Sequence, residues 1–140
     1  MNTKSLLITI VVAFITIAVT DFLIHQVWLS ATYAETKHLW RPEAEMMTKM
    51  PLMMLGQLII AAAFSLIFAA CVAEKRCLSC TLKFSFCLAL ISCAGQMMMY
   101  AVQPIPGSLV VKWCVAITAQ LQLLGFLVHK VYKLPAKSAS

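Results

Sequence analysis

The sequence predicts an all-α membrane protein, a four-helix bundle whose transmembrane helices run alternately up and down. Hydrophobic residues make up 62% of its 140 residues and charged residues only 11%, whereas soluble domains are about one quarter charged. The apolar residues form four runs of about 20 residues or more, the length a helix needs to cross about 30 Å of hydrocarbon. Most connections between the runs are short, which favours antiparallel neighbours.

The four runs cover residues 5–30, 51–73, 82–102 and 108–131, and the chain length predicts one domain, 1–140. Helices are expected in all four, because in lipid each backbone polar group must be satisfied within its own segment. The first run begins like a signal peptide. It is long, however, and it carries Asp21 and His25 where a cleavage site of small residues belongs, so we expect it to remain as a span.

The connections differ in length and character. Residues 31–50 form the one long polar segment, in which residues 43–49 are expected to make a short interfacial helix. Trp28 and Trp40 are expected at headgroup depth, where Trp is enriched. The last two runs are joined through Pro104 and Pro106, and both prolines resist helix continuation.

The distribution of Lys and Arg predicts the orientation. One side of the membrane holds seven basic residues: Lys4, Lys75, Arg76, Lys83, Lys130, Lys133 and Lys137. The other side holds four: Lys37, Arg41, Lys49 and Lys112. The positive-inside rule then places both termini in the cytoplasm. The net charge of +6 belongs to these topological signals. No basic stripe suits a nucleic-acid backbone, so the expected partner is the lipid bilayer and not nucleic acid.

Several polar side chains lie inside the predicted spans, mostly in the half nearer to residues 31–50. Asp21, His25 and Trp28 are spaced i, i+4 and i+7, so they are expected to share a helix face. A charged carboxylate inside a span costs about 2.5–3.5 kcal/mol on insertion scales, so Asp21 needs a partner. The choices are a proton shared with His25, a counter-ion (Lys112 or Arg41), or a proton of its own.

These residues predict a polar pocket that binds a small molecule, an ion or a proton and opens towards the loop. Asp21 and His25 would bind the ligand or relay a proton. The residues assigned to the pocket are Asp21, His25, Tyr33, Trp40, Arg41, Gln57, Gln96 and Tyr100. For the glutamines, Gln120 included, the alternative is hydrogen bonding between helices. An alternative function is that of an accessory or assembly subunit of a larger membrane complex, and a homo-oligomer also stays open.

Methionine and cysteine allow two other chemistries. Thioethers suit Cu(I), so an alternative metal site consists of His25, Met50, Met54 and Met98. Flexible apolar packing is the simpler interpretation of the methionines. Cys77 and Cys80 form a CxxC motif, the spacing of a redox dithiol, and a membrane thiol or quinone redox enzyme is therefore a third functional alternative. The predicted orientation puts this motif in a reducing compartment, which favours ordinary apolar cysteines.

The sequence favours a non-enzymatic function. It contains no glycine-rich phosphate loop, no nucleophile elbow and no HExxH motif, and the whole chain has four glycines. Nothing in it identifies a cofactor.

Short motifs surround the polar residues. They are Asp21-Phe-Leu-Ile-His25, Tyr33, Leu39-Trp-Arg-Pro-Glu-Ala-Glu-Met46, Leu55-Gly-Gln-Leu58 and Tyr100-Ala-Val-Gln-Pro-Ile-Pro106. With these motifs the chain, from about residue 16 to residue 133, resembles a family of small uncharacterised four-span bacterial membrane proteins. The resemblance implies a multi-pass protein of the bacterial inner membrane with no assigned activity. The CxxC motif is not part of the family pattern, and the third run has fewer glycines than that pattern implies.

Overall fold

The protein is a four-helix bundle. The structure, a computed structural model, describes residues 1–75 and 77–135; it is 87% helical and has no strand among these residues. Four helical stretches are long and apolar enough to cross a membrane: Thr3–Trp28, Met50–Lys75, Leu78–Val102 and Gly107–Val131. They differ from the predicted runs by four residues at most. The predicted all-α fold class is confirmed.

Two of the four stretches change their helical winding. The first consists of α1 (Thr3–Phe22) and a π-helical segment, Leu23–Trp28. The second consists of α4 (Met50–Ile67), a π-helical segment (Phe68–Val72) and a 3₁₀ turn (Ala73–Lys75). Between them lie α2 (Ser30–Glu35), a 3₁₀ turn (Lys37–Leu39) and α3 (Glu43–Thr48), the last at the expected interfacial helix. The other two stretches are α5 (Leu78–Val102) and α6 (Gly107–Val131).

Local sequence explains where these helices begin and end. The side chain of Asn2 caps α1 by accepting a hydrogen bond of 3.1 Å from the Ser5 N–H. Pro51 occupies the first turn of α4, where its missing N–H has no helical partner to lose. At the end of α5, Gln103 is extended, as expected for a residue that precedes a proline.

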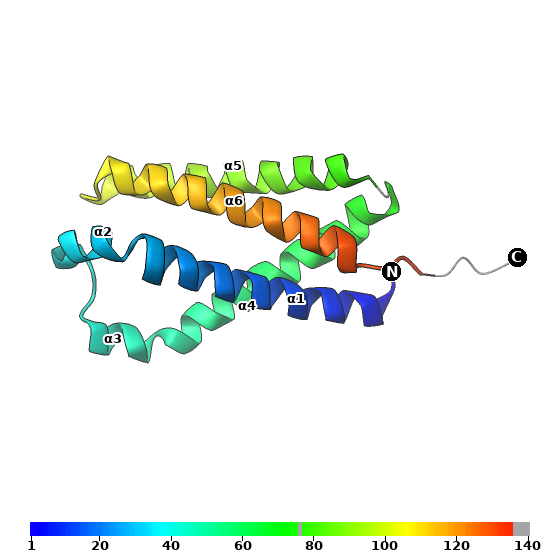
Figure 1. The fold of residues 1–140 in the computed structure, drawn as a ribbon, viewed down its shortest axis with the longest axis horizontal. Coiled ribbons are helices and arrows are strands. Elements are labelled where there is room, and N and C mark those ends of the chain that lie inside the picture. The colour runs from blue at the N-terminus through cyan, green and yellow to red at the C-terminus, as the bar shows by residue number, and fades with distance from the viewer. Residues whose placement is uncertain (76, 136–140) are drawn as a thin grey trace, which may run out of the picture.

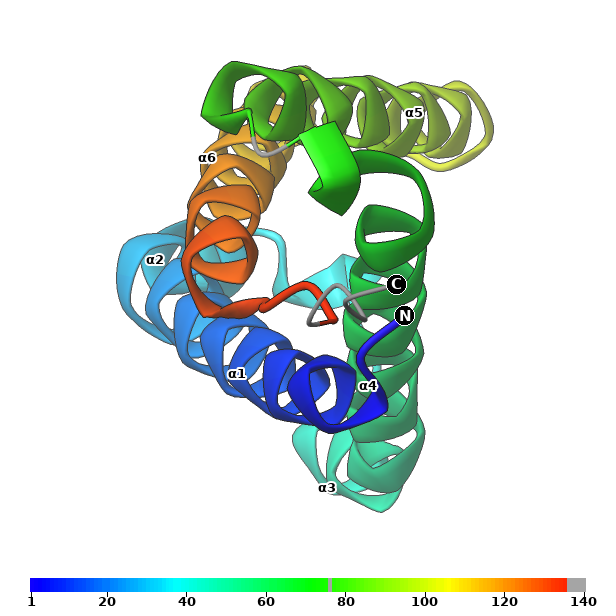
Figure 2. The same cartoon turned by 90° about the vertical axis from the view of Figure 1, so that its right-hand side faces the viewer.

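Successive long helices run in opposite directions, and α4 lies obliquely to the other three (Figure 1). Helix α1 packs against α4 and α6, and α6 packs against α5, so the order around the bundle is α4, α1, α6, α5 (Figure 2). We call the end with residues 29–49 and 103–106 the loop end. At the opposite, terminal end, Asn2 N donates to Tyr132 Oη (3.3 Å) and Lys133 N donates to Ser5 Oγ (2.7 Å), which joins the start of α1 to the residues after α6.

Small residues allow α5 and α6 to approach closely. Gly125 of α6 is buried, and a Cβ atom built on it would lie 2.1 Å from Ser85 Oγ and 3.1 Å from Ser85 Cβ. The Ser85 hydroxyl donates to the Thr81 carbonyl at 3.0 Å and is fully buried. Small and hydroxyl residues are typical of helix contacts in membranes, because they let backbones approach and keep their polar atoms satisfied. Gly125 therefore sets the spacing of this helix pair.

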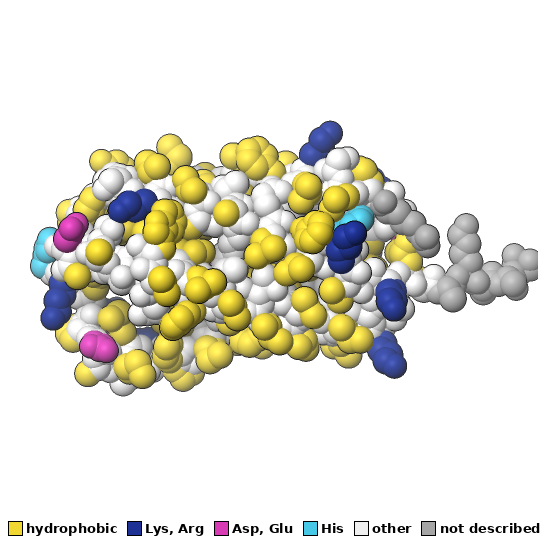
Figure 3. Space-filling view, in the orientation of Figure 1, with side chains coloured by type: hydrophobic (Ala, Val, Ile, Leu, Met, Phe, Trp, Pro, Cys, Tyr) yellow, Lys and Arg dark blue, Asp and Glu magenta, His cyan; other side chains and the backbone are white. Residues whose placement is uncertain are grey.

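The surface has the pattern of a membrane-spanning protein. On the face drawn in Figure 3, charged side chains gather towards the two ends of the long axis, and hydrophobic side chains cover the middle. The loop-end half of α4 is exposed almost all round: from Met50 to Ile60, only Gly56 and Gln57 are partly covered. Since these residues are almost all apolar, they suit lipid or a second protein and not water.

Candidate functional site

Asp21 is held by amide groups from two other helices. Gln57 of α4 donates through Nε2 to Asp21 Oδ2 at 2.6 Å, and Gln120 of α6 donates through Nε2 to Asp21 Oδ1 at 2.7 Å. Each carboxylate oxygen thus accepts a hydrogen bond from a different helix. The contact joins α1, α4 and α6 at one point inside the predicted spans. We call Asp21, Gln57 and Gln120 the carboxylate–amide cluster.

Oxygen atoms of the first span surround the Gln120 amide nitrogen. Besides Asp21, the nitrogen contacts Thr20 Oγ1 at 2.6 Å and the Ile17 carbonyl oxygen at 3.5 Å. The Thr20 hydroxyl donates to the Thr16 carbonyl at 2.7 Å, so its oxygen is free to accept from Gln120. An amide nitrogen has only two protons to share among these three acceptors. The acceptors around the Gln120 amide nitrogen therefore outnumber the protons that it can donate.

The cations that the sequence offered as counter-ions are engaged elsewhere. Lys112 Nζ donates to Thr32 Oγ1 at 2.9 Å. Arg41 pairs with Glu45 on the exposed side of α3, and this is the one ion pair among residues 1–75 and 77–135. Of the three choices that the sequence left open for Asp21, the structure therefore shows no pairing with Lys112 or Arg41. The side-chain hydrogen bonds of Asp21 come instead from two neutral amides.

A second hydrogen-bonded chain lies nearer to the loop end. His25 Nδ1 lies 2.6 Å from Tyr33 Oη, and Trp113 Nε1 donates to the same oxygen at 2.8 Å. An indole N–H can only donate, so Tyr33 accepts from Trp113 and has its own proton left for a neutral His25. A charged His25 would instead donate from Nδ1 to the second lone pair of Tyr33. The pair can thus stay hydrogen-bonded whether His25 is neutral or charged.

Aromatic rings enclose this chain. Tyr33 stacks on His25 (ring centroids 5.8 Å apart) and meets Trp40 edge-on (5.5 Å), and Trp40 meets Trp113 at 6.1 Å. Trp40 Nε1 also donates to Thr36 Oγ1 at 2.9 Å. Burial raises the pKa of Tyr33 above its ordinary 10.0, against the opposing effect of the Trp113 hydrogen bond. Tyr33 therefore stays protonated and available as a donor at neutral pH.

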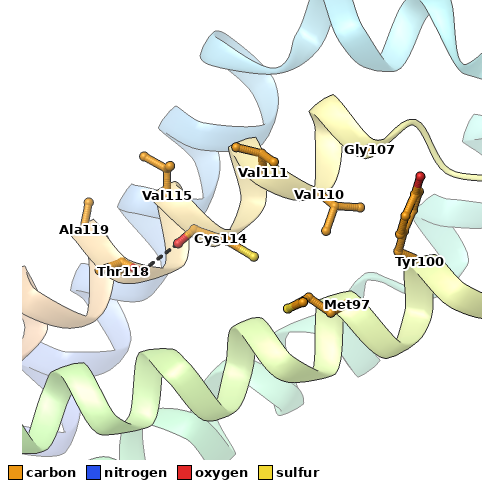
Figure 4. Close-up of a pocket in the computed structure, with 9 residues that line it drawn as sticks. All are labelled: Met97, Tyr100, Gly107, Val110, Val111, Cys114, Val115, Thr118 and Ala119. Atoms are coloured by element: carbon orange, nitrogen blue, oxygen red, sulfur yellow. Dashed lines mark hydrogen bonds between the residues drawn. The ribbon is translucent and has the colours of Figure 1, made fainter.

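The structure does not bring the third span to Asp21. Helix α5 packs on α6 and on the Phe68–Val72 segment. Tyr100 is 51% exposed and lines an apolar groove of about 870 Å³ between α5 and α6. Figure 4 shows Tyr100 there with Met97 of α5 and with Val110 and other side chains of α6. Gln96 is half-buried on the same helix. Tyr100, assigned to the pocket with Asp21, thus lies at the groove beside α6 instead.

Trp28 also lies apart from the expected face. It is 51% exposed, while Asp21 and His25 are partly buried. The π-helical winding of Leu23–Trp28 explains this, because a π turn contains more residues than an α turn and rotates the side chains that follow. Of the residues named for the alternative copper site, Met50, Met54 and Met98 are exposed and His25 uses Nδ1 for Tyr33. That site stays a prediction.

Sequence reasoning missed several members of the two groups. The sequence suggested Gln120 only for hydrogen bonding between helices. Gln120 does bond between helices, and its partner is the Asp21 carboxylate. Trp113 carried one usable signal, an indole N–H in a span beside Lys112. Thr32 and Thr36 carried none, because hydroxyl residues in a loop are common. The expected members that the structure does bring together are Asp21 with Gln57, and His25 with Tyr33 and Trp40.

Replacing Tyr33 by Phe is expected to lower the free energy of unfolding by about 1–2 kcal/mol. The variant keeps the ring but removes the oxygen shared by His25 and Trp113, which leaves a partly buried indole N–H without its acceptor. Unfolding in detergent, followed by far-ultraviolet circular dichroism, measures the loss. Replacing Tyr100 by Phe is the control and should change little, since its ring is half exposed.

Comparison with protein-family models, with curated proteins and with solved structures finds no match to this chain. The resemblance to small four-span bacterial proteins therefore stays a prediction. The helices that are long and apolar enough to span a bilayer suggest a multi-pass membrane protein.

Proposed function

We propose that this protein binds a proton at Asp21, in the loop-end half of the bundle, and that the carboxylate–amide cluster is its working site. One observation carries the proposal: both Asp21 oxygens accept hydrogen bonds from neutral amides, and no ion pair of the described residues includes Asp21. Ionised, Asp21 holds a negative charge inside the membrane, and no ion pair among the described residues offsets it. Such groups are rare and costly in spans, and they are usually functional.

Proton binding at Asp21 would change helix packing. A protonated carboxyl carries a hydrogen on one oxygen, which becomes a donor and a weaker acceptor for the N–H of Gln57 or Gln120. The contact is therefore weakened unless the amide rotates to accept the new proton through its own oxygen. Gln57 is the more sensitive partner, because the rest of the loop-end half of α4 is largely exposed. The proton would therefore control how firmly α4 is held to α1.

His25 and Tyr33 supply a route towards the loop end. His25 lies four residues after Asp21, and its Nδ1 bond to Tyr33 persists in both protonation states of the imidazole. Tyr33 belongs to α2, outside the first span. In this proposal the chain passes protons between the loop side and the cluster. With both termini in the cytoplasm of a bacterium, as the Lys and Arg distribution favours, the cluster would exchange protons with the outside of the inner membrane.

The experiment that tests the proposal is labelling with dicyclohexylcarbodiimide, an apolar reagent that modifies protonated carboxyl groups within membranes. Asp21 is expected to be labelled in the purified protein, and the Asp21→Asn variant is expected to lose this label. Mass spectrometry of peptides locates the label. Glu43 on α3 is the internal control: it is exposed, so it should react with a water-soluble carbodiimide instead.

Two results would count against proton binding. Asp21 left unlabelled at every pH would mean that the carboxylate does not take up a proton within reach of lipid. Protection of Asp21 by Na⁺ and not by K⁺ would mean that a small metal cation occupies the site, with the oxygens of Ile17 and Thr20 as further ligands.

A second candidate function is that of an accessory subunit of a larger membrane complex. The observation in its favour is the exposed, methionine-rich loop-end half of α4. In this case Asp21 would serve packing alone, and Asp21→Asn would keep the activity of the complex. Native mass spectrometry in mild detergent distinguishes the two, because the accessory role requires a second protein in fixed stoichiometry, and a homo-oligomer would show multiples of this chain.

A further inference from the structure

Two cysteines meet at the terminal end of the bundle, away from the carboxylate–amide cluster. Cys77 precedes α5 and caps it: its Sγ accepts the Cys80 N–H at 3.2 Å. Ser79 Oγ lies 3.1 Å from the same sulfur. Cys80 sits in the first turn of the helix, with Lys75 and Lys83 near enough to add positive charge. Both cysteines are free thiols and partly exposed.

We propose that Cys77 and Cys80 form a redox-active dithiol that exchanges electrons with a disulfide substrate. The geometry has the parts that this chemistry uses. Cys77 at the N-cap and Cys80 in the first turn are three residues apart, and the Cys77 sulfur accepts the Cys80 N–H, so the two residues lie on one side of the helix start. The sulfur of Cys77 receives an N–H from the helix start, where partial positive charge favours a thiolate. Cys77 also lies between two spans, where water and soluble reactants can reach it.

The ionisation of Cys77 suits a nucleophile. Hydrogen bonds from the Cys80 side chain, from the Ser79 side chain and from the Cys80 backbone lower the pKa of Cys77 from 9.0 to about 7. The thiolate of Cys77 is therefore more populated at neutral pH than that of an ordinary cysteine. A thiol with pKa near the ambient pH is the best attacking group, since nucleophilicity falls as the pKa falls further.

The exchange balances in two steps. The Cys77 thiolate attacks one sulfur of a disulfide RS–SR, the S–S bond breaks, and RS⁻ leaves with the electron pair and takes up a proton. Cys80, losing its own proton to water, then attacks the Cys77 sulfur of the mixed disulfide and releases the second RS⁻. The protein ends with a Cys77–Cys80 disulfide, and the substrate ends as two thiols. Two electrons have moved, and the reverse reaction reduces the protein again.

The other cysteines lack this arrangement. Cys71 and Cys87 are exposed and have no described hydrogen bond to their sulfur atoms. Cys93 donates to the Cys114 carbonyl at 3.6 Å, but both residues lie within the predicted spans, where lipid disfavours a thiolate. The chain thus contains its own control sites for the proposal.

The test is oxidation of the purified, reduced full-length protein in detergent by two oxidants, glutathione disulfide and oxidised thioredoxin. Free thiols are then alkylated and mapped by mass spectrometry. Cys77 and Cys80 are expected to lose reactivity together and to regain it in excess reduced glutathione, at oxidant ratios that leave Cys71 and Cys87 reduced. Faster reaction with glutathione indicates a small substrate, and faster reaction with thioredoxin indicates a protein disulfide. Reaction with neither oxidant would overturn the proposal.

The Cys80→Ser variant separates a redox role from a merely structural one. It keeps a side-chain donor beside Cys77 but cannot complete the second step, so a mixed disulfide between Cys77 and glutathione should accumulate at least tenfold over the wild-type level. Equal accumulation at Cys71 would overturn the proposal.

The rate of Cys77 alkylation is also expected to depend on pH. Because the thiolate reacts and the pKa is about 7, the rate should fall about tenfold per pH unit below 7 and level off above it. In Cys80→Ala, which loses the largest stabilising hydrogen bond, the midpoint should move to higher pH. A wild-type midpoint at the ordinary thiol value of 9.0 would contradict the geometry described here.

Discussion

Replacing Asp21 by Ala is expected to lower the free energy of unfolding by about 2–4 kcal/mol. The carboxylate is the shared acceptor for Gln57 and Gln120. Its removal leaves the Gln57 amide nitrogen without a described acceptor and the Gln120 amide nitrogen with neutral oxygens of Thr20 and Ile17 only. An unsatisfied buried donor costs about 1–3 kcal/mol, and the ionisation cost of Asp21 offsets part of that loss. Unfolding by sodium dodecyl sulfate in mixed micelles, followed by circular dichroism, measures the change.

Two further variants identify the source of the loss. Asp21→Asn retains an acceptor oxygen, and one glutamine can rotate its amide to suit the new N–H, so the loss should be about 1 kcal/mol. A double-mutant cycle between Asp21→Ala and Gln120→Ala should give a coupling energy of about 1 kcal/mol or more. Additive effects would mean that the hydrogen bond contributes nothing to stability. Glu43→Ala on the exposed α3 should be nearly neutral.

Replacing Gly125 by Ala is expected to cost about 1–3 kcal/mol, although Ala favours helices more than Gly does. The added Cβ would meet Ser85 Oγ at 2.1 Å and Ser85 Cβ at 3.1 Å. The Ser85 hydroxyl can rotate only by giving up its bond to the Thr81 carbonyl, and its Cβ can move only with the backbone of α5. The helices must therefore separate. The same unfolding experiment measures the loss.

The matched controls are Gly56→Ala and Gly95→Ala. Both glycines lie within long helices, and an added Cβ would meet nothing within 4 Å. Each should leave stability unchanged or raise it by up to about 1 kcal/mol, since Ala is the better helix former. If Gly125→Ala behaved like these two, close packing of α5 on α6 would not set the helix spacing.

The spans were predictable from the sequence because bilayer thickness fixes the length of a crossing helix. Apolar runs, together with Pro104 and Pro106, predict the helix ends, and the observed ends lie within a few residues of these predictions. The order of the helices was not predictable. All four runs are apolar on every side, so no single apolar stripe indicates which neighbour each helix meets, and contacts such as Gly125 with Ser85 decide it.

Contacts between polar side chains were predictable only where a similar depth in the membrane was enough to bring two residues together. Asp21 and Gln57 lie at similar depth on neighbouring helices, and the structure joins them. Gln96 and Tyr100 met the same criterion, but α5 is separated from α1 by α6 in the order of packing. The π-helical segment Leu23–Trp28 contains no proline or glycine, so its sequence does not predict the change of winding that turns Trp28 outward.

The measurement that tests the central claim most directly is an infrared difference titration of the protein in lipid. A carbonyl band of a protonated carboxyl is expected to appear as the pH falls, and to be absent from Asp21→Asn while remaining in Glu43→Gln. That result would identify Asp21 as the proton-binding group. The same band in wild type and Asp21→Asn, or no band at any pH at which the bundle stays folded, would contradict proton binding at Asp21.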